Sequence, residues 1–403
     1  MSGVNAAPTA HALTTRYESG VVPLRPLTIV RGEGCWLYDE QGRRYLDFGL
    51  NYGVGNVGHA HPKVVAAIQA QAARLTFAPG TVANDVRACY LERLASVAPP
   101  GLSRAFLANS GTEAVEAAIK FACGTAGRHE LVAAKRGFHG RTLGALALNG
   151  TPAYRQTFEP LLSASTLVPF GDVEALKQAV TSNTAAVVLE PIQGEGGVHL
   201  PPDDYLRAAR DLANDAGALL VFDEVQTGFG RTGAFWACQH DGVTPDILAF
   251  AKAAGGGLPL GGVLLAEHVR LAPKQHGSTF GGNPVACAAG LAVLDIIGEG
   301  RLVENAAHMG ARLVTGLQEA AGDEARAVRG RGLMVALELR RRHGPVLAAL
   351  QEAGVLALPT GATTLRFLPP LTVTADDVDV VVAATARAVA DMSESAAATL
   401  AAR

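Results

Sequence analysis

Asp223 and Lys252 are the two residues whose types and positions could carry catalysis together. Asp223 follows an apolar run at residues 218–222, and Lys252 follows a second apolar run at residues 247–251. Short apolar runs are typical of buried parallel strands, and ligands gather at the edge where such strands end. The pattern therefore predicts an acid and an amine at one edge of a sheet.

An amine and an acid in this arrangement fit one cofactor. Burial disfavours the ammonium form, so an enclosed lysine is nucleophilic and can form a Schiff base with an aldehyde. Pyridoxal phosphate is such an aldehyde, and it also uses an acid on its pyridine nitrogen. The alternative is that Lys252 extends into solvent and Asp223 caps a helix. Only 6 of the 34 basic residues are lysines, which favours a functional role for Lys252.

The segments around these two residues resemble the signature of class III pyridoxal-phosphate aminotransferases. The resemblance is carried by DEVQTGFGRTG and FAKAAGGGLPLG, and it extends through VRGEGCWLYDEQGRRYLDF, NSGTEAVEAAIKFA, GFHGRTLGALA, LEPIQGEGGV, GSTFGGNP and LRFLPPL. It is strongest to the acetylornithine branch, including enzymes that aminate carrier-bound aminoadipate semialdehyde in bacterial lysine synthesis. It implies transfer of a terminal (ω) amino group between an Nα-acylated diamino acid and 2-oxoglutarate or glutamate. Lysine on an acidic amino-group carrier protein is the first hypothesis for the donor, and free N-acetylornithine is the alternative.

The run SRAFLANSGTEAVEAAIKFA predicts a strand, a tight turn and a helix that begins near Ser110, Gly111 and Thr112. Amides at a helix N-terminus bind phosphate, and hydroxyl groups add donors, so these residues are candidates for the cofactor phosphate. An ordinary helix N-cap is the alternative. In the next motif, GFHGRTLGALA, the resemblance implies that Phe138 stacks on the pyridine ring, whereas simple core packing is its alternative.

Four further residues are substrate candidates through the resemblance. Arg141 is implied to bind the substrate carboxylate that lies far from the reacting carbon, and a guanidinium fork suits a carboxylate. Glu195 is implied to pair with Arg366, so that one pocket could serve two donors whose carboxylates lie at different distances. Tyr52 matches a substrate-contacting tyrosine of ornithine aminotransferases. The alternatives are a packing role for Tyr52 and a surface carboxylate for Glu195.

Two more residues complete the predicted cofactor site. Gln226, in DEVQ, is implied to bind the ring hydroxyl. Thr279, in GSTFGGNP, is implied to reach the phosphate of the neighbouring subunit's cofactor, which makes the protein a homodimer. His59 and His61 lack a third ligand in their sequence context, so no metal site is predicted.

The elements that must position these residues indicate an α/β protein. The resemblance implies a fold type I transferase, with a mostly parallel central sheet, helices on both faces and a small α/β C-terminal lobe. The predicted domains are an N-terminal arm and hairpin at 1–48, a cofactor-binding domain at 49–284 and a small domain at 285–403. Alternating runs at 27–46 predict antiparallel hairpins, and Thr374 with Asp377 predicts the start of the last helix.

Composition excludes several classes of protein. A net charge of -3 gives no support for nucleic-acid binding. No apolar segment reaches the roughly 18 residues that span a bilayer, and no secretory signal pattern begins the sequence, so a cytoplasmic enzyme without membrane partners is expected. The five cysteines show no CxxC spacing and are interpreted as buried thiols.

Three other functions fit the sequence less well than transamination. A nicotinamide oxidoreductase would need GxGxxG at the first strand-to-helix turn, and the sequence lacks it there. A binding protein without catalysis would be expected to have lost Lys252. An aminomutase would not need two alternating substrates, to which the implied pair of Glu195 and Arg366 points.

Overall fold

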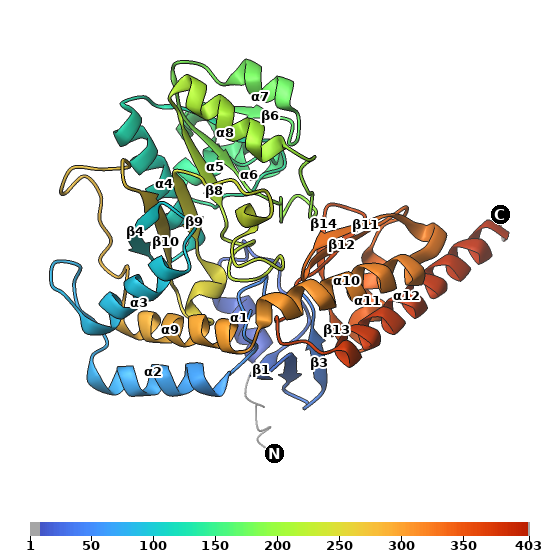
Figure 1. Ribbon diagram of the computed structural model, residues 1–403. Coiled ribbons are helices and arrows are strands. Elements are labelled where there is room, and N and C mark those ends of the chain that lie inside the picture. The colour runs from blue at the N-terminus through green and yellow to red at the C-terminus, as the bar shows by residue number, and fades with distance from the viewer. Residues whose placement is uncertain (1–8, 402–403) are drawn as a thin grey trace.

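The computed structural model describes the backbone of residues 9–401 and the side chains of residues 9–394. A large lobe is built on a seven-stranded sheet, and a smaller lobe on a four-stranded sheet (Figure 1). A third sheet joins strands from the two ends of the chain. The predicted α/β class is confirmed.

The central sheet forms the edge at which the predicted catalytic pair lies. Its order is β4-β10-β9-β8-β7-β5-β6. Its strands are β4 (Leu102–Ala108), β5 (Glu130–Ala134), β6 (Ser165–Val168), β7 (Thr184–Leu189), β8 (Leu219–Asp223), β9 (Ile247–Phe250) and β10 (Gly261–Ala266). The pairs from β9 to β6 are parallel, and only β10 runs antiparallel to its neighbours within this sheet. The predicted mostly parallel sheet is confirmed.

Side chains of the central strands alternate between two apolar clusters. In β8, Leu219 and Val221 belong to one cluster, while Leu220 and Phe222 belong to the other. Helices cover both faces, as Figure 1 shows. The first cluster includes side chains of α4 (Gly111–Ala126) and α5 (Leu143–Ala147), and the second includes those of α7 (Val173–Ala179) and α8 (Tyr205–Ala216). Burial on both faces explains why the strands read as continuous apolar runs.

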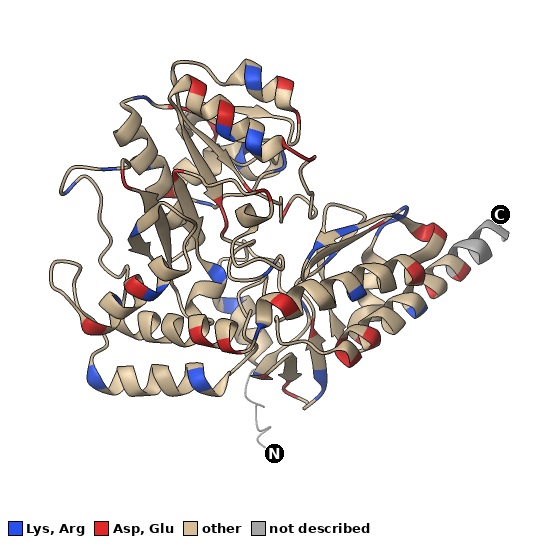
Figure 2. Ribbon diagram, in the orientation of Figure 1, with Lys and Arg blue, Asp and Glu red and all other residues tan. Residues whose placement is uncertain are grey.

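Three more helices pack together beside this sheet. They are α2 (Pro62–Arg74), α3 (Asp85–Ser96) and α9 (Pro284–Glu299). Charged side chains lie mainly on such outer helices and on loops, and both signs are mixed (Figure 2). None of the helices in the described residues is long and apolar enough to cross a membrane. Short elements connect the larger ones: α6 (Pro152–Arg155), η1 (Gln156–Leu161), η2 (Ala237–His240), η3 (Lys252–Gly255) and η4 (Gly322–Glu324).

The small lobe is an antiparallel sheet covered by helices. Its strand order is β11-β12-β15-β14, with β11 (Ala325–Arg331), β12 (Met334–Leu339), β14 (Leu358–Thr360) and β15 (Thr364–Phe367). Its helices are α10 (Leu302–Ala321), α11 (Gly344–Glu352) and α12 (Ala375–Ala401). At the start of α12, Thr374 N donates to Asp377 Oδ2 at 2.9 Å and Asp377 N donates to Thr374 Oγ1 at 3.2 Å. The predicted capping box is confirmed.

The N-terminal hairpins join the small lobe. Their strands β1 (Ile29–Glu33), β2 (Trp36–Asp39) and β3 (Arg44–Asp47) are antiparallel, as predicted, and β3 pairs in parallel with β13 (Val355–Leu356). The domain limits at 48 and 284 stay predictions.

Two details differ from the sequence interpretation. Residues Ala10–Tyr17 form a helix, α1, because Thr9 caps it through Ala12 N, so this part of the arm is regular where only weak patterning was recognised. Residues 1–8 of the arm lie outside the described part. All five cysteines were expected to be buried, but Cys89 on α3 is exposed and Cys123 is half-buried.

Candidate active site

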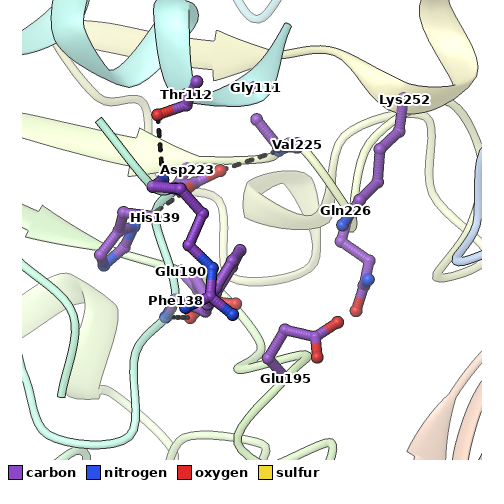
Figure 3. Close-up of a pocket in the computed structure, with 12 residues that line it drawn as sticks. Gly111, Thr112, Phe138, His139, Glu190, Glu195, Asp223, Val225, Gln226 and Lys252 are labelled. Atoms are coloured by element: carbon purple, nitrogen blue, oxygen red, sulfur yellow. Dashed lines mark hydrogen bonds and ion pairs between the residues drawn. The ribbon is translucent and has the colours of Figure 1, made fainter. Parts of the chain in front are cut away.

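One cavity of about 260 Å³ opens where the strands of the central sheet end. Most predicted site residues contribute to its wall, and Figure 3 shows them facing a common space. The wall consists of Gly111, Thr112, Phe138, His139, Gly140, Arg141, Glu190, Glu195, Asp223, Val225, Gln226 and Lys252. Segments that follow β4, β5, β7, β8 and β9 supply these residues, so the predicted sheet edge is the site.

Lys252 is the first residue of η3, directly after the buried end of β9. Its backbone φ is 42°, a left-handed value that carries strain for a residue with a side chain and recurs at functional sites. The side chain is mostly enclosed and faces the cavity. Burial lowers the pKa of its amine, although the carboxylates of Glu195 and Asp223 act in the opposite direction. A lowered pKa increases the neutral fraction, which a nucleophilic amine requires.

Asp223 ends β8 with its carboxylate held from two sides. Val225 N donates to Oδ1 at 3.0 Å, and His139 Nδ1 lies 2.7 Å from Oδ2. Both side chains are buried, at 1% and 5% exposure for His139 and Asp223. Burial alone would lower the pKa of His139, but its hydrogen bond and charge interaction with Asp223 raise it. The result is a buried hydrogen-bonded pair that fixes the orientation of the Asp223 carboxylate.

His139 was missed by the sequence analysis. Its neighbour Phe138 was recognised, but no local pattern indicates that the imidazole meets an aspartate 84 positions later. Asn149 fixes the backbone here, since its Oδ1 accepts from His139 N at 2.7 Å and its Nδ2 donates to Gly140 O at 2.8 Å. His139 therefore belongs to the site as a residue that orients Asp223.

Glu190 joins two of the loops that line the cavity. Its Oε1 accepts from Phe138 N at 3.0 Å, and its Oε2 accepts from Gly194 N at 2.9 Å. Burial raises the pKa of Glu190 to about 7, and the charge of His139 acts against this rise. Glu190 is thus the link between Phe138 and the turn that carries Glu195.

The start of α4 borders the cavity as predicted, and its first residues have different positions. Ser110 is the N-cap, and its Oγ accepts from Glu113 N at 3.3 Å, which is the alternative that the sequence left open. Gly111 and Thr112 line the cavity. A Cβ on Gly140 would come within 2.3 Å of Thr112 Oγ1, so the backbone passes close to the helix start here. The N-terminus of a 16-residue helix faces the cavity as a site for an anion.

Glu195 and Arg366 form the ion pair that the resemblance implied. The two contacts, Nη1 to Oε1 and Nη2 to Oε2, are each 2.9 Å, so the pair is bidentate. Arg366 lies on β15 with its side chain 1% exposed, while the Glu195 side chain is 24% exposed. Burial acts to raise the pKa of Glu195, but the charge and hydrogen bonds of Arg366, together with the charge of Lys252, lower it overall. The small lobe thus contributes the buried partner of a cavity residue.

Gln226 lines the cavity and has one side-chain atom without a hydrogen-bond partner in the described part of the chain. Its Nε2 donates to Tyr52 O at 3.3 Å, but its buried Oε1 has no partner among the described residues. Figure 3 shows the amide near Glu195, on the same side of the cavity as Lys252. Tyr52 itself is 49% exposed and has a φ of 55° in a glycine-rich loop. An unpaired buried amide oxygen indicates that a polar group from a ligand completes this position.

Thr279 lies apart from this cavity. It borders a separate one of about 380 Å³, together with Asn109, Glu113 and Glu116 of the same chain. A role toward the cofactor of a second subunit stays a prediction for this residue.

His59 and His61 contact different partners. His59 Nε2 lies 2.8 Å from Asp47 Oδ2, and the ring of His61 caps α2 by accepting from Lys63 N at 3.2 Å. Within residues 9–394, no group of three or more metal-binding side chains is found. The two histidines are accounted for by these local contacts.

The residues present fit pyridoxal 5'-phosphate. Lys252 provides an enclosed amine, the paired Asp223 provides a fixed negative charge, and the start of α4 provides amides for a phosphate. The free Oε1 of Gln226 suits a ring hydroxyl. No single one of these features identifies the cofactor, but their occurrence together around one cavity does.

Comparisons with known proteins agree with this geometry. Residues 17–389 match the family model of class III aminotransferases. The chain is 44% identical over 378 residues to a [LysW]-aminoadipate semialdehyde transaminase of Deinococcus radiodurans, covering 93% of this chain and 88% of the relative. It is also 44% identical over 369 residues to an acetylornithine aminotransferase of Methanosarcina acetivorans, covering 91% and 93%. An ornithine aminotransferase structure from Toxoplasma gondii, with partial occupancy of PLP, superposes with a TM-score of 0.92 at 33% identity, covering 96% and 94%.

Proposed function

The chain belongs to the class III aminotransferases, which are fold type I enzymes that use pyridoxal 5'-phosphate, and we propose that it transfers a terminal amino group. The donor is an Nα-acylated diamino acid, and the acceptor is 2-oxoglutarate, which becomes glutamate. Within this class we propose lysine bound to an acidic carrier protein as the donor, with carrier-bound aminoadipate semialdehyde as its counterpart. N-acetylornithine is the alternative donor.

The cofactor, when bound, supplies a carbonyl carbon that condenses with amines and a ring that accepts electron density from the neighbouring carbon. Lys252 would hold the cofactor through Nζ, and the same amine, when free, could accept and return the proton at the reacting carbon. Its lowered pKa suits both roles, because a neutral amine is needed to attack and to accept a proton.

Asp223 has the task of keeping a proton on the pyridine nitrogen. The carboxylate is held in place for this role from two sides, because His139 Nδ1 contacts Oδ2 and Val225 N donates to Oδ1 inside a buried site. Phe138 and Gln226 would orient the ring, and Gly111 and Thr112 would bind the phosphate. The contacts that hold Asp223 are already formed, so this carboxylate needs little reorganisation when the substrate binds.

The bidentate contact between Glu195 and Arg366 is the observation that carries the proposal of two alternating substrates. Glutamate has a carboxylate directly beside its reacting carbon, where a free Arg366 would bind it. An ω-amine has no carboxylate there, and Glu195 then neutralises the buried arginine. Arg141 can bind the distant carboxylate of either substrate. An aminomutase would have no need to mask and unmask one arginine.

The choice of donor rests on the names of relatives and is therefore proposed. One relative at 44% identity is named for LysW-bound aminoadipate semialdehyde, and another at 44% is named for acetylornithine. A homodimer and a cytoplasmic location are further parts of the proposal. In that homodimer Thr279, which borders a separate cavity, would contact the phosphate of the neighbouring subunit's cofactor.

The test compares two donors in the same assay. Carrier-bound lysine should give a higher kcat/KM than free N-acetylornithine. Exposed basic side chains of the enzyme attract an acidic carrier over a distance. The advantage in kcat/KM of the carrier-bound donor should therefore shrink as the ionic strength rises from about 0.02 M to about 0.5 M, because the screening length shortens. The value for N-acetylornithine should change much less over that range.

Two results would contradict carrier-bound lysine as the donor. If free N-acetylornithine matches or exceeds the carrier-bound amine at low ionic strength, the enzyme acts in arginine synthesis. If neither donor is converted while other ω-amines are, the proposed substrate class is wrong although the transaminase assignment stands.

A further inference from the structure

Arg141 is held by aromatic rings. Its guanidinium carbon lies 3.9 Å from the centroid of the Tyr154 ring and 5.3 Å from that of Phe138. The two rings meet edge to face, with centroids 5.9 Å apart and an interplanar angle of 84°. A cation over an aromatic face is attracted by the ring quadrupole. Tyr154 is thus the main protein contact of this guanidinium, although it does not line the cavity.

The position of Tyr154 is fixed by its own neighbours. It lies on α6, and the next residue, Arg155, donates through Nη1 to Ala147 O at 3.1 Å and to Asn149 O at 3.2 Å. Asn149 also holds His139 and Gly140, as described above. One buried asparagine therefore joins the backbone before Arg141 to the helix that carries Tyr154. The distance between guanidinium and ring is set by this shared anchor.

The donors of the Arg141 guanidinium remain available. Among residues 9–394, no side-chain hydrogen bond or ion pair engages them, and only the backbone N of Arg141 is bonded, to Thr112 Oγ1 at 3.2 Å. Glu116 faces the same segment, but its Oε1 already accepts from Gly144 N at 2.9 Å and Ala145 N at 3.1 Å. A stacked guanidinium keeps its N–H groups in the plane of the fork, where a carboxylate can accept two of them.

We propose that Tyr154 is a specificity-determining positioning residue, whose ring supports the Arg141 guanidinium so that its fork faces the distant carboxylate of the substrate. The inference rests on the proposed function, because it assumes that Arg141 binds that carboxylate. The ring, and not the hydroxyl group, does the positioning. Without the ring, the exposed Arg141 side chain samples other rotamers. Binding of the carboxylate must then also fix the productive rotamer, which weakens the affinity.

The experiment uses two donors that differ only in this carboxylate. N-acetylornithine has it, and N-acetylputrescine has the same terminal amine and chain without it. Tyr154→Leu should raise KM for N-acetylornithine by about three- to tenfold, the range that a cation–π contact of ordinary strength supports, with kcat changed less than about twofold. The kcat/KM for N-acetylputrescine should stay within about twofold of the starting enzyme. Binding of glutarate to the holoenzyme, measured by calorimetry, should weaken by the same factor as the KM effect.

Two matched variants separate the ring from other causes. Tyr154→Phe keeps the ring and should restore the values of the starting enzyme for N-acetylornithine and glutarate. Tyr38→Leu removes a similar stack, since Arg31 lies 3.6 Å from the Tyr38 ring outside the cavity, and it should change neither donor. Equal losses for both donors in Tyr154→Leu would make Tyr154 merely structural and overturn the inference. A Phe variant as weak as the Leu variant would assign the effect to the hydroxyl and overturn it as well.

Arg141→Leu distinguishes this inference from the proposed function. If Arg141→Leu weakens N-acetylornithine and glutarate while Tyr154→Leu does not, the role of Tyr154 is wrong and that of Arg141 stands. If Arg141→Leu leaves both ligands unchanged, the proposed carboxylate site is wrong, and the inference fails with it.

Discussion

The floor and the mouth of the cavity are built in different ways. The floor consists of Asp223, His139 and Glu190, which follow strands and are no more than 6% exposed. The carboxylate oxygens of Asp223 and Glu190 and Nδ1 of His139 are paired with one another or with backbone amides. The mouth contains Arg141, which is exposed, and Glu195, whose side chain is 24% exposed. These two residues stand in glycine-rich loops.

The difference indicates where the enzyme fixes its chemistry and where it adjusts to substrates. Charges in a buried, fully paired floor cannot reorient, so they stabilise the same charge distribution in every half-reaction. Partly exposed residues at the mouth can exchange one partner for another at lower cost, as the proposed release of Arg366 from Glu195 requires. Substitutions in the floor should therefore reduce the rate for all substrates, and substitutions at the mouth should change the ratio between substrates.

Lys252→Ala should have the largest effect. The attacking amine and the proton carrier are lost together, so turnover should fall by at least about 10⁴-fold with every donor. The visible absorbance of the lysine-bound cofactor should disappear, which a spectrum of the purified variant checks. Lys177→Ala, at an exposed position of α7, is the matched control and should keep both. Appreciable transamination by the Lys252 variant would remove this residue from the mechanism.

Asp223→Asn should come next, with a loss of several orders of magnitude. A neutral amide cannot hold the proton on the pyridine nitrogen, yet it can still accept from Val225 N, so the cofactor should be retained. Single-turnover rates for both half-reactions, together with the cofactor content, test this expectation. Both rates should fall by a similar factor because Asp223 belongs to the floor. Rates near those of the starting enzyme would contradict the assigned role.

Glu195→Ala should alter the balance between substrates more than the overall rate. Arg366 would stay unmasked, so the half-reaction with glutamate should be favoured over that with the ω-amine by about tenfold relative to the starting enzyme. The two half-reaction rates must be measured separately. Asp379→Ala removes a bidentate contact with Arg312 in the small lobe and is the matched control. An equal loss in both half-reactions would show that Glu195 acts as part of the floor.

Glu190→Gln should have the smallest effect, visible in the pH dependence of stability. The folded state raises the pKa of Glu190 from 4.5 to about 7, so this group's contribution is fully present below pH 4.5 and is lost as the pH rises through about 7. Glutamine does not titrate. The free energy of unfolding of the cofactor-free variant should therefore fall less over this range than that of the starting protein. Denaturant titrations at the two ends of the range measure it, and an equally steep fall would exclude Glu190 as the titrating group.

The positions of Asp223 and Lys252 at the ends of their strands could be predicted from the sequence. The apolar runs before Asp223 and Lys252 define strands, and parallel strands end at a common edge, so the pair had to lie close together. Ser110 and Thr374 could be recognised as helix starts because capping depends on residues within three positions. The role of the GSTFGGNP segment, in contrast, depends on a second chain, and the position of Thr279 in one chain leaves it a prediction.

The sequence by itself determined where the apolar strands and the helices lie and which polar residues end or cap them. These features depend on residues that are close together along the chain. Only the tertiary structure decided which side chains meet. His139 reaches Asp223, Glu190 joins two loops, and Tyr154 supports Arg141, and none of these contacts leaves a local pattern. Glu195 and Arg366 lie 171 positions apart and belong to different lobes. Their pairing was predicted only through the family resemblance. Such contacts depend on how loops and lobes pack, which is fixed by the sum of many distant interactions.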